Sequence, residues 1–147
     1  MALSKSQRWY LCDPQNEVDE DSIVSLIEQC KGARIKVTVH LSIGDIEKVT
    51  HLVMHTQKNK LVPRTQAYMK ALLCKKWIAS TTLGLSDSIQ QGEFQSEVEH
   101  EVAGDTISGI SLAPTRARTS AKPKLLQGLT ICFYGAFNLR ASKQAHA

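Results

Sequence analysis

The spacing of apolar residues along the chain predicts alternating strands and helices. The clearest element is a helix that begins with Asn16 as its N-cap and ends at Gly32, because apolar residues between them recur every three or four positions. These apolar residues are Ile23, Leu26, Ile27 and Cys30. Apolar runs bounded by turn residues predict strands. The predicted strands cover residues 8–13, 33–39, 49–54 and 76–80.

Two further helices complete the predicted domain. Pro63 suits the first position of a helix that ends at Cys74, and a short last helix is expected from Asp87 to Gln91. The order strand, helix, strand, strand, helix, strand, helix predicts an α/β fold, with a four-stranded parallel sheet flanked by helices. Besides the residues of the first helix, the expected core contains Val37, Val53, Leu72, Trp77 and Ile78.

The helical and strand periodicities stop after Gly92. Residues 96–124 carry first acids and then basic and small residues, so we expect a linker there. The run LLQGLTICFYGAF at residues 125–137 then predicts an additional apolar strand. This strand is expected to pair with the edge of its own sheet or with another copy of the chain, because an unpaired apolar strand favours self-association.

Composition and charge narrow the classes of protein. The chain has 147 residues, 42% hydrophobic and 22% charged, which suits one domain with a packed core. No apolar run approaches the roughly 20 residues of a membrane span, and the N-terminus does not resemble a secretion signal. Residues 1–110 carry 12 Lys and Arg against 14 Asp and Glu. Residues 111–147 carry six Lys and Arg and no Asp or Glu. The positive charge therefore belongs to the tail, which argues against direct nucleic-acid binding by the folded body.

The residue types that bind metals are not arranged as a metal site. The four cysteines (Cys12, Cys30, Cys74 and Cys132) include no CxxC pair, so we expect four reduced, buried thiols in an intracellular protein. His51 and His55 would be about 13 Å apart on a strand, too far to share one ion. We therefore expect no metal and no cofactor.

Catalytic chemistry is not expected either. The carboxylates of Asp45 and Glu47, and those of Glu97, Glu99 and Glu101, have no nucleophile or base beside them and are predicted to be solvated. No glycine-rich phosphate-binding loop and no nucleophile motif is present. The sequence thus favours a binding protein over an enzyme.

Several motifs carry a resemblance to a known family. VTHLVMHT, RTQAYMKALLCKKWIAS and DSI resemble the third strand, second helix, fourth strand and third helix of the BRCT domain. EVAGDTISG, RAR and LLQGLTICFYGAF are similar to the linker and second-repeat start of a tandem member of that family. The resemblance implies a BRCT repeat at residues 1–95, an inter-repeat linker at 96–124 and the start of a truncated second repeat at 125–147.

The same resemblance implies a phosphopeptide-binding site and assigns residues to it. Arg64 and Thr65 match the group that holds the peptide main chain. The phosphate-binding lysine of the family falls on Ala67, and its hydroxyl-glycine pair falls on Cys12 and Asp13. A phosphate needs a hydrogen-bond donor and a cation, so Asp13 and Ala67 make this pocket degenerate. Lys70, one helical turn after Ala67, offers a displaced cation.

Two other features of the family are altered in this chain. The aromatic pocket implied by the resemblance needs a complete second repeat, and the family's tryptophan in the third helix is replaced by Leu83 or Gly84. The basic stretch RARTSAKPK is read as a solvated linker, with a nuclear import signal or a nucleic-acid-binding tail as alternatives.

These observations lead to one functional expectation with one alternative. The chain is expected to be a non-enzymatic interaction module of a nuclear DNA damage response protein. Its expected partners are proteins, including phosphorylated repair proteins, and no small-molecule substrate or membrane is expected. The alternative is a fragment or splice product of a tandem-BRCT scaffold related to ubiquitin ligases, without ligand binding of its own.

Overall fold

The computed structural model describes most of the chain between Arg8 and Gly135. The described residues are 8–12 (backbone only), 25, 28–32, 37–40, 42–56, 59–80, 86–123, 127–132, 134 and 135. Residues 25 and 28–32 are helical, within the first predicted helix. The expected core residues Ile23, Leu26 and Ile27 lie outside the described residues, as do Asp13, Leu83 and Gly84.

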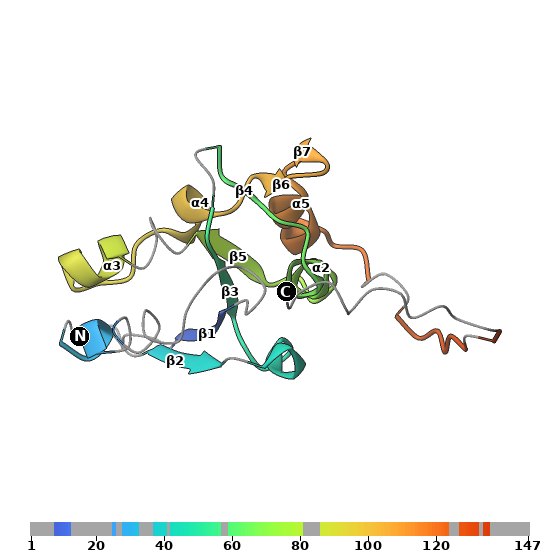
Figure 1. Cartoon of the computed structure of the whole chain (residues 1–147), viewed down its shortest axis with the longest axis horizontal. Coiled ribbons are helices and arrows are strands. Elements are labelled where there is room, and N and C mark those ends of the chain that lie inside the picture. The colour runs from blue at the N-terminus through green and yellow to red at the C-terminus, as the bar shows by residue number, and fades with distance from the viewer. Residues whose placement is uncertain are drawn as a thin grey trace, which may run out of the picture.

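The main sheet has the strand order β2-β1-β3-β5, and each neighbouring pair is parallel (Figure 1). Its strands are β1 (Arg8–Cys12), β2 (Val37–His40), β3 (His51–Met54) and β5 (Trp77–Ser80). The mixed α/β class predicted from the sequence is confirmed. The prediction of one sheet was incomplete, however, because β4 (Leu61–Val62), β6 (Gly104–Asp105) and β7 (Gly109–Ile110) form a second, three-stranded sheet.

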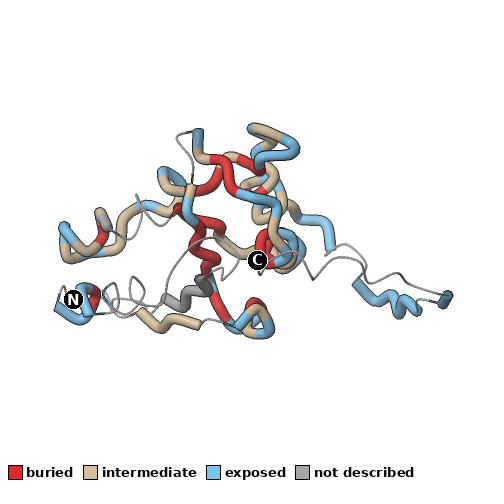
Figure 2. Tube along the Cα trace, in the orientation of Figure 1, coloured by how far each residue is buried: buried red, intermediate tan, exposed pale blue. Residues whose placement is uncertain are grey.

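Strand β3 runs through the centre of the molecule and is buried on both faces, as Figure 2 shows in red. Leu52 and Met54 pack into the larger hydrophobic cluster with Tyr68, whereas Val53 packs with Cys30 in a smaller one. Since successive side chains of a strand point to opposite faces, the two clusters lie on opposite sides of the sheet. A parallel strand covered on both sides explains the continuous apolar run.

Helix α2 (Gln66–Leu73) packs against β3 and β5. It begins three residues later than predicted, because the Thr65 side chain accepts a hydrogen bond from the Tyr68 backbone N–H and so caps the helix. Pro63 is not the first helical residue. Between β3 and α2, Leu61 and Val62 are buried and form β4, which was not predicted from the sequence.

The segment predicted to be a linker contains four short elements. They are α4 (Glu97–His100), β6, β7 and α5 (Ala113–Thr119), and they follow α3 (Ser86–Gln91). Val102 is buried and its backbone N–H bonds to the carbonyl of Ile78, so this segment covers the outer edge of β5. Helix α5 contacts both α2 and β5. The predicted domain division at residue 95 stays a prediction, but residues 96–122 pack on the preceding body.

The predicted apolar strand at the chain end is wrong for the described residues. No strand is assigned in 127–132, 134 or 135, and this tail runs outward from the body (Figure 1). The side chains of Leu129, Ile131 and Tyr134 are exposed, and so is that of Cys132. The expectation that the cysteines are buried therefore fails at Cys132, holds at Cys30 and is only partly met at Cys74, which is half-buried.

The burial predicted for the core residues is confirmed for some of them and not for others. Val53 and Ile78 are buried as expected. Val37, Leu72 and Trp77 are only partly buried; Val37 and Leu72 pack against the edges of the two core clusters. Within the described residues, no helix is long and apolar enough to cross a membrane.

Candidate peptide-binding site and adjacent groove

Of the predicted site residues, Arg64 and Thr65 lie at the start of α2, near one end of the main sheet. Cys12 ends β1, which pairs in parallel with β3. Helix α2 connects β3 to its parallel neighbour β5, so it runs back against the strands and its N-terminus lies at their carboxyl end. In this sheet β2 and β3 lie on opposite sides of β1, so the strand order reverses at β1. Open α/β sheets place ligand sites where the strand order reverses in this way.

Arg64, just before α2, is held by Asp105 on β6. Arg64 Nε donates to Oδ1 and Nη2 to Oδ2 of this carboxylate, each at 3.1 Å, and Nη2 also donates to Ser108 Oγ. The Arg64 side chain stays 32% exposed while that of Asp105 is 4% exposed. The bidentate pair therefore orients the guanidinium and leaves part of it exposed. The sequence assigned Arg64 to the site but missed Asp105, which is 41 residues away.

Asp105 is the last residue of β6, and its side chain binds the tight turn between β6 and β7. Its Oδ1 also accepts the backbone N–H groups of Ile107 and Ser108, each at 2.9 Å. Burial by itself raises the pKa of Asp105, but the hydrogen bonds from Arg64, Ser108 and Ile107 outweigh burial and lower that pKa overall. Asp105 is thus held as a carboxylate, which keeps Arg64 oriented.

Gly104 allows the turn to pack closely. A Cβ atom at Gly104 would lie 2.0 Å from the backbone carbonyl oxygen of Gly109, and the φ of Gly109 is +69°. Both positions therefore require glycine, one for space and the other for its left-handed conformation.

The remaining predicted site residues give a mixed result. Thr65 caps α2 with its side chain, so its hydroxyl already accepts a hydrogen bond. Ala67 is fully buried in the larger core cluster, and Lys70 is half-buried. Cys12 is described by its backbone alone, and Asp13 lies outside the described residues. The structure brings Arg64 and Thr65 to one helix end, and it places Ala67 in the core.

Tyr68, near the start of α2, belongs to the larger core cluster. Its ring is completely buried, and its hydroxyl oxygen has no hydrogen-bond partner among the described residues. Burial, followed by the negative charge of Asp105, raises the pKa of Tyr68 to about 12. Tyr68 therefore stays neutral and acts as a packing residue beneath the Arg64–Asp105 pair.

A second ion pair holds α5 to the sheet. Arg118 Nε and Nη2 donate to the two Glu101 oxygens at 3.1 Å each, and Thr115 Oγ1 donates to Glu101 Oε2 at 2.7 Å. The Arg118 guanidinium carbon lies 3.3 Å from the centroid of the Trp77 ring. Trp77 also stacks on His51, with ring centroids 6.4 Å apart. This cluster combines a charge-assisted pair with a cation–π contact.

Two sequence-based expectations are wrong here. Glu101 was predicted to be solvated, but its side chain is 5% exposed. The stretch RARTSAKPK was read as a solvated linker, but its Arg118 is engaged with Glu101 and Trp77. Both residues looked unpaired in the sequence because their partners come from separate elements. Among the described residues, no group of three or more His, Cys, Asp or Glu could hold a metal ion.

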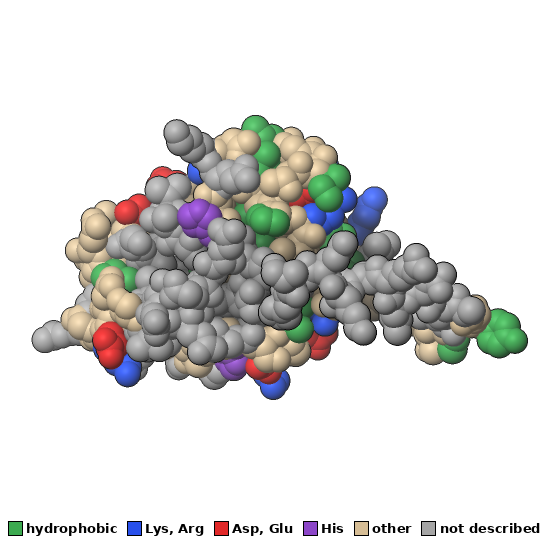
Figure 3. All heavy atoms as spheres, in the orientation of Figure 1, with side chains coloured by type: hydrophobic (Ala, Val, Ile, Leu, Met, Phe, Trp, Pro, Cys, Tyr) green, Lys and Arg blue, Asp and Glu red, His purple; other side chains and the backbone are tan. Residues whose placement is uncertain are grey.

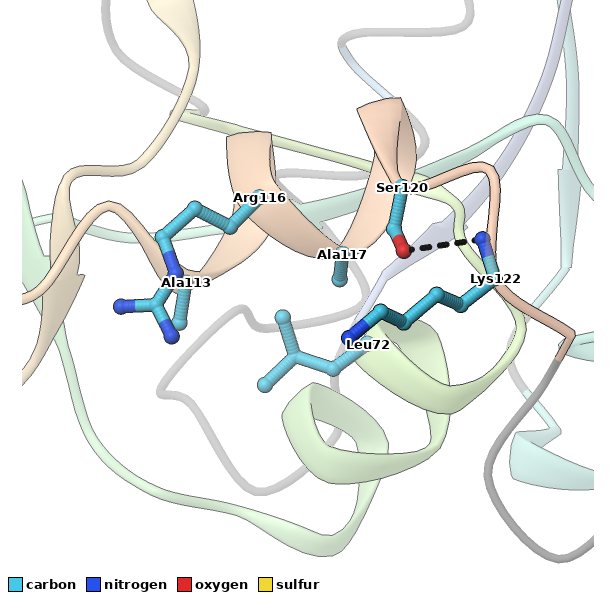
Figure 4. Close-up of a pocket in the computed structure, with 6 residues that line it drawn as sticks. All are labelled: Leu72, Ala113, Arg116, Ala117, Ser120 and Lys122. Atoms are coloured by element: carbon cyan, nitrogen blue, oxygen red, sulfur yellow. Dashed lines mark hydrogen bonds between the residues drawn. The ribbon is translucent and has the colours of Figure 1, made fainter.

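A groove lies between the second half of α2 and helix α5 (Figure 4). It consists of two adjoining cavities of about 450 Å³ and about 280 Å³, which share Leu72, Ala117 and Ser120. Their other lining residues are Met69, Leu73, Lys75, Ala113, Arg116, Lys122 and Pro123. The floor is apolar, the charged residues of the lining are all cationic, and Met69 and Leu73 are 43% and 41% exposed.

Lys75 fixes the chain where it leaves this groove. Its Nζ donates to the backbone carbonyls of Ser120 and Lys122, each at 2.6 Å. Lys75 follows α2, and the two carbonyls lie at the C-cap of α5 and just beyond it, where backbone carbonyls have no partner within a helix. The path of the chain after α5 is therefore tied to the end of α2.

None of the protein-family models compared matches this chain. Several curated proteins show distant similarity to it, including the following three. The "Breast cancer type 1 susceptibility protein homolog" of Rattus norvegicus is 31% identical over 93 residues, which is 62% of this chain and 5% of that protein. The "Protein BREAST CANCER SUSCEPTIBILITY 1 homolog" of Arabidopsis thaliana is 29% identical over 125 residues, 83% of this chain and 12% of that protein.

The third relative is the "BRCA1-associated RING domain protein 1" of Arabidopsis thaliana. It is 30% identical over 94 residues, 60% of this chain and 13% of that protein. The chain thus matches only a small part of each of these relatives. The resemblance noted from the motifs was to the tandem BRCT region of the breast cancer type 1 susceptibility protein in particular, and these similarities agree with it at the level of a distant relation.

Proposed function

We propose that this chain is a non-enzymatic protein-interaction module of the BRCT type, belonging to a nuclear DNA damage response or repair protein. The observation that carries the proposal is the similarity to breast cancer type 1 susceptibility protein homologues, which extends over up to 83% of the chain. The parallel order β2-β1-β3-β5 and the position of Arg64 and Thr65 at the start of α2 support it. Its partners are protein segments, and it needs no cofactor.

We further propose that peptide binding by this module does not depend on phosphate. A dianionic phosphate needs a cation and a hydrogen-bond donor together. The position that resembles the family's lysine is Ala67, which is fully buried among core residues. Arg64 is oriented by Asp105 but partly exposed, so it can hold a peptide main chain while the phosphate contacts are missing. The alternative, a scaffold fragment without ligand binding of its own, predicts that Arg64 binds nothing.

Fluorescence polarisation with a matched peptide pair tests this proposal. Both peptides carry phenylalanine three residues after a serine, and one is phosphorylated on that serine. We expect the two dissociation constants to differ by less than tenfold, which corresponds to about 1.4 kcal/mol. Arg64→Ala should weaken binding of both peptides, and Arg116→Ala, an exposed arginine on α5, should not.

The opposite results would separate the alternatives. A phosphate-dependent gain above tenfold that Lys70→Ala removes would assign the phosphate contact to Lys70 and overturn the degenerate pocket. The variant Cys12→Ser/Asp13→Gly/Ala67→Lys restores the residue types of the family, so it should acquire phosphate dependence. If this variant melts cooperatively and binds neither peptide, the BRCT-type site is wrong and the scaffold alternative is favoured.

A further inference from the structure

Two sets of exposed apolar residues are relevant here, one at a groove and one on the tail that follows it in the chain. Met69 and Leu73 border the groove between α2 and α5. Leu129, Ile131 and Tyr134 lie on the tail, only six residues after Pro123, which itself lines the groove. Figure 3 shows hydrophobic atoms at the tip of the tail. Single exposed apolar residues are ordinary, but a hollowed apolar face together with a segment that exposes three large apolar side chains suggests an interface.

We propose that the tail (residues 127–135) of one copy of the chain inserts into the α2–α5 groove of a second copy, and that the exchange is reciprocal. This self-association goes beyond the proposed peptide-binding function and uses a different surface. The groove has the size range of cavities that hold small apolar groups, and its two halves share Leu72 and Ala117 as a common floor.

The charges of both partners are compatible with this exchange. Residues 125–135 contain no charged side chain. The groove carries Lys75, Arg116 and Lys122 at its margin, so an uncharged segment can bury itself there against the aliphatic stems of these side chains. An acidic tail would point to ionic attraction instead. The driving force is the removal from water of Leu129, Ile131 and Tyr134.

The exit of the chain favours a second copy over the chain's own groove. Lys75 holds the backbone of Ser120 and Lys122 at the groove, and the tail then continues away from α2 and α5 (Figure 1). A tail that already points outward reaches a partner without reversing its direction. Two copies related by a two-fold axis would each give one tail and accept one, which closes the assembly as a dimer.

Disulfide trapping tests this arrangement with a cysteine that the tail already has. The variant Ala117→Cys/Cys132→Ser puts a thiol in the groove and removes the one on the tail. It is mixed with the unmodified chain, whose tail carries the exposed Cys132. Under mild oxidation we expect a band of twice the chain mass on a non-reducing gel, with residues 117 and 132 joined in the peptide mass spectrum. The matched control Ile107→Cys/Cys132→Ser has its thiol at a site that is 72% exposed but outside the groove, and should give no such band.

Sedimentation velocity over about a hundredfold concentration range supplies the second measurement. Leu73→Asp in the groove and Leu129→Asp on the tail should each raise the dimer dissociation constant at least tenfold, whereas Ile107→Asp should leave it unchanged. Thermal melts establish that each variant is folded. A monomer throughout this range would overturn the proposal. So would a dimer that Leu73→Asp does not weaken. A chain that carries Ala117→Cys and keeps Cys132 can also form the 117–132 disulfide within itself, and the proposal is overturned if the bond forms only there.

Discussion

Strand β3 and the tail are two apolar runs of similar composition with opposite outcomes. The run HLVM of β3 is at most 4% exposed at every position, whereas Leu129, Ile131 and Tyr134 of the tail are 67%, 52% and 101% exposed. Both runs satisfy the same local pattern for a strand. The comparison shows that an apolar run favours a strand but does not make one.

The difference comes from what surrounds each run. Strand β3 has hydrogen-bonding neighbours on both sides, β1 and β5, and a hydrophobic cluster on each face. The described part of the tail has no paired strand, so it gains no hydrogen bonds from a strand ladder, and Leu129, Ile131 and Tyr134 stay exposed. Burial and strand pairing are therefore gained together.

The sharpest test of this contrast is a matched pair of leucine substitutions. Leu52→Ala removes a fully buried side chain and leaves a cavity, so it should lower the free energy of unfolding by about 3–5 kcal/mol. Leu129→Ala changes an exposed side chain and should alter it by less than about 0.5 kcal/mol. Urea unfolding, measured at a concentration where the chain is monomeric, gives both values. Equal losses would mean that the tail is part of the core.

The next test asks whether residues 96–122 belong to the body or to the solvated tail. Arg118→Ala would leave the carboxylate of Glu101 buried without its cation, at a cost of about 3 kcal/mol. The control Arg116→Ala removes an exposed arginine two residues away on α5 and should change stability by less than about 0.5 kcal/mol. Thermal and urea unfolding of both variants decide the matter. If Arg118→Ala behaves like the control, the segment is a solvated linker after all.

The smallest effect is expected at the turn between β6 and β7, where it should depend on pH. Asp105→Asn removes a carboxylate that binds Arg64 and two backbone N–H groups, so we expect a loss of about 2 kcal/mol at pH 7. The pKa of Asp105 is lower in the folded chain than the roughly 3.9 of an unfolded aspartate. Its stabilisation is therefore fully present above about pH 4 and is lost as the pH falls through the folded pKa.

Urea unfolding at pH 7 and in acid measures this dependence. The unmodified chain should lose stability on acidification more steeply than Asp105→Asn, and the two curves should converge at low pH. Parallel curves would show that Asp105 is not held as a carboxylate by its neighbours. Arg64 would then lack the partner that orients it at the candidate site.

The amino-acid sequence was sufficient for the elements whose pattern is local. Strands β1, β3 and β5 and helix α3 lie within about two residues of their predicted bounds, because apolar runs and turn residues act on neighbours in the chain. The start of α2 was misplaced because Pro63 suits a first helical position, and the side chain of Thr65 decided the cap instead. Arg64 and Thr65 were assigned to the site from a motif within one stretch of sequence; the structure places them at the start of α2, and their binding role stays a prediction.

Only the tertiary structure decided which distant residues meet. Arg64 and Asp105 are 41 positions apart, and Glu101 and Arg118 are 17 apart, so no local periodicity connects either pair. Residues 96–122 fold by covering the edge of β5 and the end of α2, whereas the described tail pairs with no sheet edge, although its strand pattern is as clear as that of β3. The physical reason is that burial of apolar surface and satisfaction of backbone hydrogen bonds are properties of an assembled neighbourhood, and a run of residues carries only the capacity for them.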